Sequence, residues 1–314
     1  MEIDNQTNVM YFILLGLSDN PKAGTALFAL FLAIYSVGVV SNIAIMVTVT
    51  ADPQLHTPMY FFFGNLSLVD ICLTTVTVPQ LLINIISDRK VISFQRCITQ
   101  LYFFVAMVGT DCLLLGVMAY DRYVAICSPL RYFMVMDKKA CSQLVARSWA
   151  IGLLNSLLHS LMITRVSFCA SNLVQNLLWD IPPLQKLSCS DTSLNELLIL
   201  AEAFPIIMAS ILSKVISYGF IITTILSINL SEGRRKAFHT CSSHLIVVSL
   251  FYGTILFTYI RPPSSYSLEK DKVVTVMYAI ITPMLNPFIY SLTNEKIKGA
   301  LSKMVDRCSI HLKL

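Results

Sequence analysis

The stretch Met118–Cys127, "MAYDRYVAIC", places the charged pair Asp121 and Arg122 at the end of a long apolar run. The run before it, residues 101–120, reads LYFFVAMVGTDCLLLGVMAY. A mostly apolar segment of about 20 residues is long enough to cross a bilayer as a helix. We therefore predict a membrane helix that meets water at Asp121 and Arg122. An ordinary interfacial Arg that extends its charge into water is the alternative interpretation of the pair.

The composition indicates a membrane protein. The 314 residues include 13% charged residues, whereas soluble domains carry roughly a quarter, and the mean hydropathy is +0.69. We predict an all-α, seven-transmembrane helix bundle over residues 24–292, between a tail (1–23) and an amphipathic helix and tail (293–314). Within the predicted helices, the stretch over residues 197–229 carries the charged residues Glu202 and Lys214. The seven stretches are residues 24–50, 59–87, 98–126, 140–164, 197–229, 239–261 and 272–292.

The distribution of basic residues predicts the orientation of the bundle. With the N-terminus outside, the inner segments hold thirteen of the 23 Lys and Arg residues and the outer segments nine. Cytoplasmic loops carry such an excess, so we expect an extracellular N-terminus and a cytoplasmic C-terminus. The sequon at Asn5 agrees, because glycosylation requires an exposed lumenal site. The acidic start lacks a basic leader, so we interpret it as a mature tail. The scattered basic residues favour lipids or a cytosolic partner over nucleic acid.

Two acidic residues lie deep in the predicted bundle. Asp111 precedes Arg122 by 11 residues, and Asp70 lies about 11 residues from the inner start of the second helix. At 1.5 Å per residue, both carboxyl groups lie about 16 Å from the inner face. Two carboxylates at one depth repel each other unless a proton or cation lies between them. We predict a sodium or proton site completed by Asn42 and Asn286. Two separately hydrogen-bonded, neutral acids are the alternative.

The sequence offers little support for an enzyme. His239, Cys241 and His244 invite a metal site, but at 100° per residue only the last two approach a common helix face. A structural or switching role at the inner end of the sixth helix is the favoured interpretation. The sequence has no Cys-x-x-Cys pair, phosphate-binding Gly-rich loop or nucleophile elbow, so we expect no cofactor beyond a sodium ion.

Four motifs in order resemble a known family. They are "PMYFFFGNLSLVD" at 58–70, "MAYDRYVAICSPLRY" at 118–132, "KAFHTCSSHL" at 236–245 and "PMLNPFIYSLTN" at 283–294. With them, the chain resembles the rhodopsin-like G-protein-coupled receptors and, among these, the olfactory receptors. It departs from the family pattern at His239, where Ser is usual, and at Ser41, where Gly usually precedes Asn42. The four motifs together are far more specific than any one of them.

The resemblance implies a receptor for small volatile odorants. The ligand would bind in the outer half of the bundle and activate a stimulatory heterotrimeric G protein that raises cyclic AMP. The receptor would lie in the plasma membrane of olfactory neuron cilia. Apolar walls with a few hydroxyl groups suit a weakly polar ligand, although packing within the bundle is the alternative for each residue. The implied pocket residues are Phe104, Val105, Val108, Gly109, Ile206, Tyr252, Ile255, Tyr259 and Tyr278.

The resemblance also implies an activation switch at the inner end. When the sixth helix moves outward, Arg122 would separate from Asp121 and face the G protein. Tyr218 and Tyr290 are candidate partners for Arg122 in that state. The implied switch and coupling residues are Asp121, Arg122, Tyr123, Tyr218, His244, Asn286, Pro287 and Tyr290.

Two other classes of membrane protein share part of this pattern. A small-solute transporter can carry carboxylates at the membrane midplane, but this chain shows no repeated halves. A non-olfactory receptor of the same fold would keep the Asp-Arg-Tyr motif without the second-helix and sixth-helix motifs quoted above.

The cysteines depart from the family pattern. Olfactory receptors usually carry a third Cys in the long outer loop, at the position where this chain has Trp179. That loop Cys usually bonds the Cys at the top of the third helix, which is Cys97 in this chain. The resemblance implies a disulfide between Cys169 and Cys189, so Cys97 is expected to stay unpaired. We expect a poorly functional receptor for this reason. Burial of Trp179 in the mouth of the bundle, in place of the bond, is the alternative.

Overall fold

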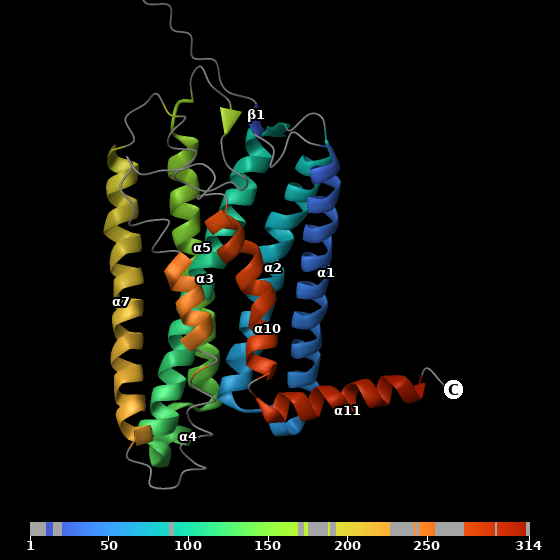
Figure 1. Cartoon of the computed structure of the whole chain (residues 1–314). Helices are drawn as coiled ribbons and strands as arrows, with labels where there is room; N and C mark the ends of the chain where they lie inside the picture. Colours follow the sequence, from blue (N-terminus) through green and yellow to red (C-terminus); the bar gives the residue numbers. More distant parts are fainter. Residues whose placement is uncertain are drawn as a thin grey trace, which may run out of the picture.

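The computed structural model shows long helices that run side by side, with a last helix lying across one end of the bundle (Figure 1). It describes residues 11–14, 21–87, 91–168, 173–174, 188, 193–226, 242, 245–254, 273–292 and 294–311. The helices are α1 Pro21–Ala51, α2 Pro58–Ile86, α3 Phe94–Cys127, α4 Tyr132–Val135, α5 Lys138–Thr164, α7 Ser193–Leu226, α10 Thr282–Leu292 and α11 Glu295–His311. Short turns are η1 Pro53–Leu55, η2 Pro129–Arg131 and the π-helical turn η4 Met277–Ile281.

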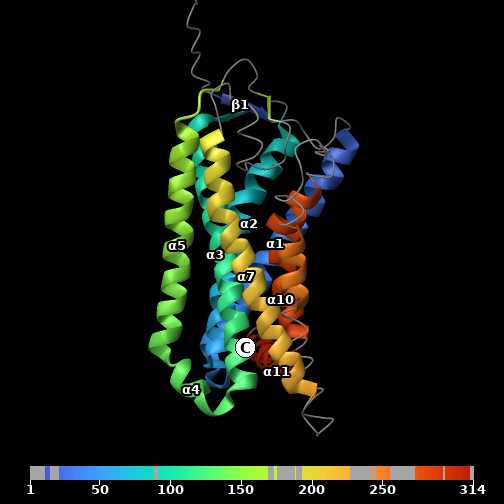
Figure 2. The same cartoon turned by 90° about the vertical axis from the view of Figure 1, so that its left-hand side faces the viewer.

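The predicted helical membrane fold is confirmed. Within the described residues, four helices are long and apolar enough to span a bilayer: Lys22–Ala51, Pro58–Ile86, Phe94–Cys127 and Val273–Ser291. The long helices α5 and α7 run beside them in both views (Figures 1 and 2). The sixth predicted stretch is helical where it is described, over residues 245–254.

The start of α3 differs from the prediction. The helix begins at Phe94, whereas the apolar pattern predicted residue 98. The Ser93 side chain accepts a hydrogen bond from the Arg96 backbone N–H at 3.4 Å and so caps the first turn. Such caps satisfy N–H groups that have no partner within the helix. Helix α3 therefore extends beyond its apolar segment into polar sequence.

A small sheet lies at the end of the bundle opposite α4 and α11 (Figure 1). Strand β1 (Tyr11–Leu14) pairs antiparallel with β2 (Val91–Ser93) and parallel with β3 (Leu173–Val174). The sequence predicted a tail for residues 11–14, and its pattern does not indicate this sheet. We call the sheet end the outer end and the α4 end the inner end, following the predicted topology.

Helix α3 lies at the centre of the bundle and packs against α2, α5 and α7. Its approach to α5 depends on Gly152, since a Cβ atom there would collide with the Thr110 side chain and would lie 2.9 Å from the Ala106 carbonyl oxygen. A small residue lets two helix backbones come close and pack tightly. The core of α3 is thus fixed from three sides.

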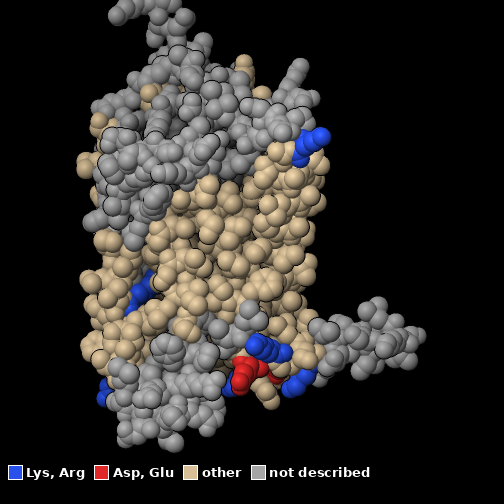
Figure 3. Space-filling view, in the orientation of Figure 1, with Lys and Arg blue, Asp and Glu red and all other residues tan. Residues whose placement is uncertain are grey.

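The surface agrees with a membrane environment. Between the two ends, the described surface is almost free of charged side chains in the view of Figure 3, and acidic and basic atoms gather at the inner end beside α11. Large apolar side chains such as Val40 and Leu154 are 66% exposed on this surface. Contiguous exposed apolar surface of this kind is typical of contact with lipid.

Candidate functional site

A buried polar group links α2 to α10 near the middle of the bundle. Asn286 donates from Nδ2 to both carboxylate oxygens of Asp70, at 3.0 Å each. Both residues are almost fully buried, with Asp70 0% and Asn286 1% exposed. A buried carboxylate needs such donors because it has lost its water. The structure thus brings together two of the four predicted ion-site residues.

The other two residues of the predicted ion site show buried oxygen atoms without partners. Asp111 is 1% exposed, and its Oδ1 has no hydrogen-bond partner among the described residues. The same holds for Oδ1 of Asn42 and of Asn286 and for Oγ of Ser67. Asn42 uses its Nδ2 to reach the Gly38 and Pro283 carbonyl oxygens at 3.0 and 3.2 Å. Oxygen acceptors that lack donors are the ligands that a hard cation takes. The residues of the predicted site therefore offer the type of oxygen ligand that a sodium ion takes.

A second buried network consists of Lys214, Tyr252 and Cys112 and joins three helices. The sequence alone predicted no role for Lys214. Lys214 of α7 is 3% exposed, and its Nζ donates to the Tyr252 hydroxyl at 2.5 Å. The ammonium group also lies 4.0 Å from the centroid of the Tyr252 ring. The signal in the sequence was the charge itself, since an ionisable residue within a membrane helix marks a functional site by default.

The Tyr252 hydroxyl is the centre of this network. It donates to the Cys112 carbonyl oxygen at 3.0 Å and lies 2.9 Å from the Cys112 sulfur. A phenol oxygen carries one proton and accepts two hydrogen bonds. Because the Tyr252 hydroxyl donates its one proton to the Cys112 carbonyl oxygen, its oxygen acts as the acceptor for the Lys214 ammonium group and for the Cys112 thiol. One oxygen atom therefore ties α3, α7 and the sixth helix together.

Asp121 of the predicted inner-end switch has a hydrogen-bond partner that the sequence did not predict. Tyr132 of α4 donates to Oδ1 of Asp121 at 2.8 Å, and Asp121 is 1% exposed. The described residues show no ion pair between Asp121 and Arg122. Adjacent residues on a helix point about 100° apart, so they do not face each other. Burial and the Asp121 carboxylate raise the pKa of Tyr132, which keeps its hydroxyl a donor.

Three tyrosines of the predicted switch lie near this end. Tyr218 is buried in a cluster with Ala119 of α3, and Tyr123 packs against that cluster. The ring of Tyr290 lies 4.6 Å from the ring of Phe63. They come from α3, α7 and α10, which places aromatic groups around the inner end of α3. Pro287 is buried in α10. The remaining switch candidates, His239, Cys241 and His244, lie outside the described residues.

The predicted pocket residues are only partly described. Phe104 and Tyr278 are 2% exposed each, with ring centroids 6.0 Å apart, while Val105 and Val108 are half-buried. Gly109 faces α5, where its Cβ would lie 3.7 Å from the Gly152 Cα. Of the other predicted pocket residues, Ile206 lies in α7 without a described side chain, and Ile255 and Tyr259 lie outside the described residues. The predicted glycosylation site and the outer-loop residues also lie outside the described residues: Asn5, Cys169, Trp179 and Cys189.

Comparisons with known proteins identify relatives over the whole bundle. A family model described as "Olfactory receptor" matches residues 31–307. Human olfactory receptor 1L6 is 48% identical over 308 residues, which cover 98% of this chain and 89% of that protein. Human olfactory receptor 1F1 is 50% identical over 303 residues, covering 96% and 97%. Mouse olfactory receptor 5AP2 is 48% identical over 301 residues, covering 96% and 95%.

Proposed function

Because the chain belongs to the olfactory receptor family, we propose that a small volatile odorant in its outer half makes it activate a stimulatory G protein at its inner end. The family membership makes it an odorant receptor with a seven-helix membrane fold, and not an enzyme. It also excludes the two alternative classes, a small-solute transporter and a non-olfactory receptor of the same fold. The proposal adds the place of binding, the type of G protein and the resulting rise in cyclic AMP.

One observation carries the proposal: the hydroxyl of Tyr252 connects α3, α7 and the sixth helix at a single buried point. The resemblance implies an odorant pocket that includes Tyr252 and extends to its outer side, and a switch at Asp121 on its inner side. A ligand needs only different affinities for two arrangements of these helices in order to shift the receptor between them. A change at the tie would then reach the inner end.

The inner end presents an apolar surface for a protein partner. Leu130 is 96% exposed, Phe133 82% and Met134 75%. They lie in η2 and α4, directly after α3 and beside the Tyr132 that bonds Asp121. Large apolar side chains this exposed, at the end of the bundle that faces the cytoplasm, are typical of a protein interaction site. We assign this surface to the G protein.

A sodium ion is part of the proposal. Asp111 would hold it through the carboxylate oxygen that has no partner, together with Asp70, Asn42 and Asn286. The ion would supply positive charge between two buried carboxylates that otherwise repel each other. The buried oxygen atoms without partners described above support this assignment.

The test is an odorant panel applied to cells that express the full chain, with cyclic AMP as the readout and surface staining as the control. We expect a concentration-dependent rise for a subset of volatile, weakly polar compounds. Surface-delivered receptor that responds to no compound would contradict odorant activation. A response that persists without the stimulatory G protein would contradict the coupling. The cilia of olfactory neurons are the proposed location.

A further inference from the structure

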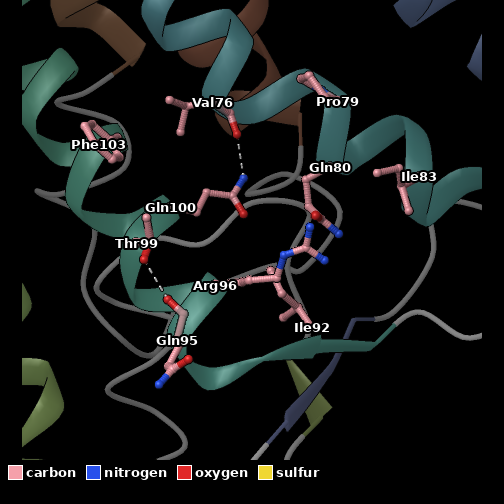
Figure 4. Close-up of a pocket in the computed structure, with 10 residues that line it drawn as sticks. All are labelled: Val76, Pro79, Gln80, Ile83, Ile92, Gln95, Arg96, Thr99, Gln100 and Phe103. Carbon is pink, nitrogen blue, oxygen red and sulfur yellow. Dashed lines mark hydrogen bonds between the residues drawn. The ribbon is translucent and has the colours of Figure 1, made fainter.

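A cleft of about 550 Å³ opens between the outer ends of α2 and α3 (Figure 4). It is separate from the odorant pocket that the resemblance implies, which lies on other faces of α3. One part of its wall is polar and the other apolar. The lining residues are Val76, Pro79, Gln80, Ile83, Ile92, Gln95, Arg96, Thr99, Gln100 and Phe103.

Pro79 and Gln100 shape this cleft. Pro79 lies inside α2, where it has no N–H to donate to the preceding turn. Gln100 of α3 donates from Nε2 to the Val76 carbonyl oxygen at 2.9 Å, across the cleft. The bond satisfies a carbonyl near the proline and holds the two helices in place. The cleft is therefore a built feature of the helix pair.

The cleft extends from the headgroup level into the level of the acyl chains. Arg96 precedes Arg122 by 26 residues, which is about 39 Å along the helix at 1.5 Å per residue. The hydrocarbon core is about 30 Å thick, and the bilayer with headgroups about 40–45 Å. Arg96 thus lies at the level of the outer headgroups. Phe103 lies about 10 Å deeper, among acyl chains, and is 43% exposed. Val76 on the facing helix lies 18 residues from the inner start of α2 at Pro58, which is about 27 Å along that helix and so a similar depth.

We propose that this cleft is a binding site for a phospholipid of the outer leaflet. The Arg96 guanidinium binds the phosphate diester, because its planar donors match phosphate oxygens. Figure 4 shows the Arg96 and Gln80 side chains extending toward each other within the cleft. Gln80 is oriented by Asn84, whose Oδ1 accepts from Gln80 Nε2 at 3.0 Å. One acyl chain lies along Val76 and Phe103.

Charge and chemistry together favour this occupant. Among the described residues of the lining, Arg96 carries a positive charge and none carries a carboxylate. The polar wall carries the amides of Gln80 and Gln95, whose N–H groups donate to ester and phosphate oxygens. The Thr99 hydroxyl donates to the Gln95 carbonyl oxygen at 2.9 Å and so belongs to the wall itself. A free inorganic anion would use the polar wall alone and leave the apolar wall without a partner. A lipid uses both.

Native mass spectrometry of the full-length receptor in detergent tests the site. The probes are dioleoyl phosphatidylcholine and dioleoylglycerol, which has the same chains and no phosphate. We expect a one-to-one complex with the phospholipid that falls about tenfold in Arg96→Gln, which loses a charge-assisted hydrogen bond. Thr99→Trp, which fills the cleft, should abolish the complex. The matched control is Arg165→Gln at the exposed outer end of α5, and it should not change binding.

Three results would overturn the proposal. Equal binding of dioleoylglycerol would show an apolar groove that does not recognise phosphate. An equal loss in Arg165→Gln would show unspecific attraction to positive charge. Displacement of the lipid by inorganic phosphate alone would show a site for free anions. None of these results bears on odorant activation, which has its own readout in cyclic AMP.

Discussion

Replacing Tyr252 by Phe should raise the activity of the receptor in the absence of odorant. The substitution keeps the ring and removes the oxygen atom that bonds Cys112 and Lys214. The sixth helix then loses the hydrogen bonds that Tyr252 makes to α3 and α7. Since outward movement of the sixth helix is the proposed activating change, the arrangement seen here loses stability relative to the active one.

The size of the effect follows from the bonds lost. A hydrogen bond to a charged group contributes about 1.5–3 kcal/mol, and a neutral one about 1 kcal/mol. Only bonds that differ between the two states shift their equilibrium. Loss of the ammonium bond alone therefore shifts it about 10- to 150-fold. An active state populated at about 0.1% would rise to a level of about 1–10%, which is a readily measured basal signal.

The assay is basal cyclic AMP, normalised to surface receptor, for the wild type, Tyr252→Phe, Lys214→Met and the double variant. The two single changes should each raise the signal and should not add, because they break the same bond. Tyr35→Phe is the matched control, since its hydroxyl lies 3.2 Å from Thr75 Oγ1 and joins α1 to α2 instead. Unchanged basal output in Tyr252→Phe, or additive effects of the two single changes, would refute the reasoning.

The other predictions concern the two ends of the signalling path. Arg122→Ala should abolish odorant-induced cyclic AMP at normal surface levels, and an unaltered response would remove Arg122 from the switch. Asp70→Asn and Asp111→Asn should each change the sodium dependence of activation, because each removes one of two buried negative charges; sodium titrations that superimpose on the wild type would exclude the ion.

The membrane fold was predictable because a bilayer imposes a length and an apolar composition on each helix. Residues 24–50, 59–87 and 140–164 differ from α1, α2 and α5 by a few residues at their ends. Helix α5 begins earlier than predicted because the Asp137 side chain accepts from the Ala140 backbone N–H at 2.6 Å and so caps the helix at Lys138. The common depth of Asp70 and Asp111 followed from the rise per residue, and the structure shows both buried.

Contacts between distant segments were not predictable in this way. Lys214, Tyr252 and Cys112 are separated by up to 140 residues, and no spacing rule joins them. Strand β1 has four residues and its partner β2 three, which is too short for an alternating pattern. The bond from Tyr132 to Asp121 depends on how the chain turns after α3. These features arise from packing in three dimensions.

The outer end bears on the missing loop cysteine. Cys97 is a buried free thiol, 0% exposed, in a cluster with Phe12 and Phe168. The Phe12 ring lies 5.3 Å from that of Phe168 and 6.2 Å from that of Phe94. Truncating a buried Phe to Ala costs about 3–5 kcal/mol, and a native disulfide contributes about 2–4 kcal/mol. The packing of Phe12 in the cluster around Cys97 therefore contributes a free energy of stabilisation comparable to that of the disulfide that this chain lacks.

This comparison sharpens the prediction for Trp179→Cys. If the missing bond limits the receptor, Trp179→Cys should improve surface staining and odorant response, and Cys97→Ser in the same chain should cancel the gain. Phe12→Ala should lower surface delivery of the wild type, because it removes the packing over Cys97, and should do so less once the new disulfide holds the outer end. Tyr11→Ala is the control, since Tyr11 is 51% exposed on the same strand. Equal delivery and response of the wild type and Trp179→Cys, together with a large loss in Phe12→Ala, would mean that packing by β1 already replaces the bond.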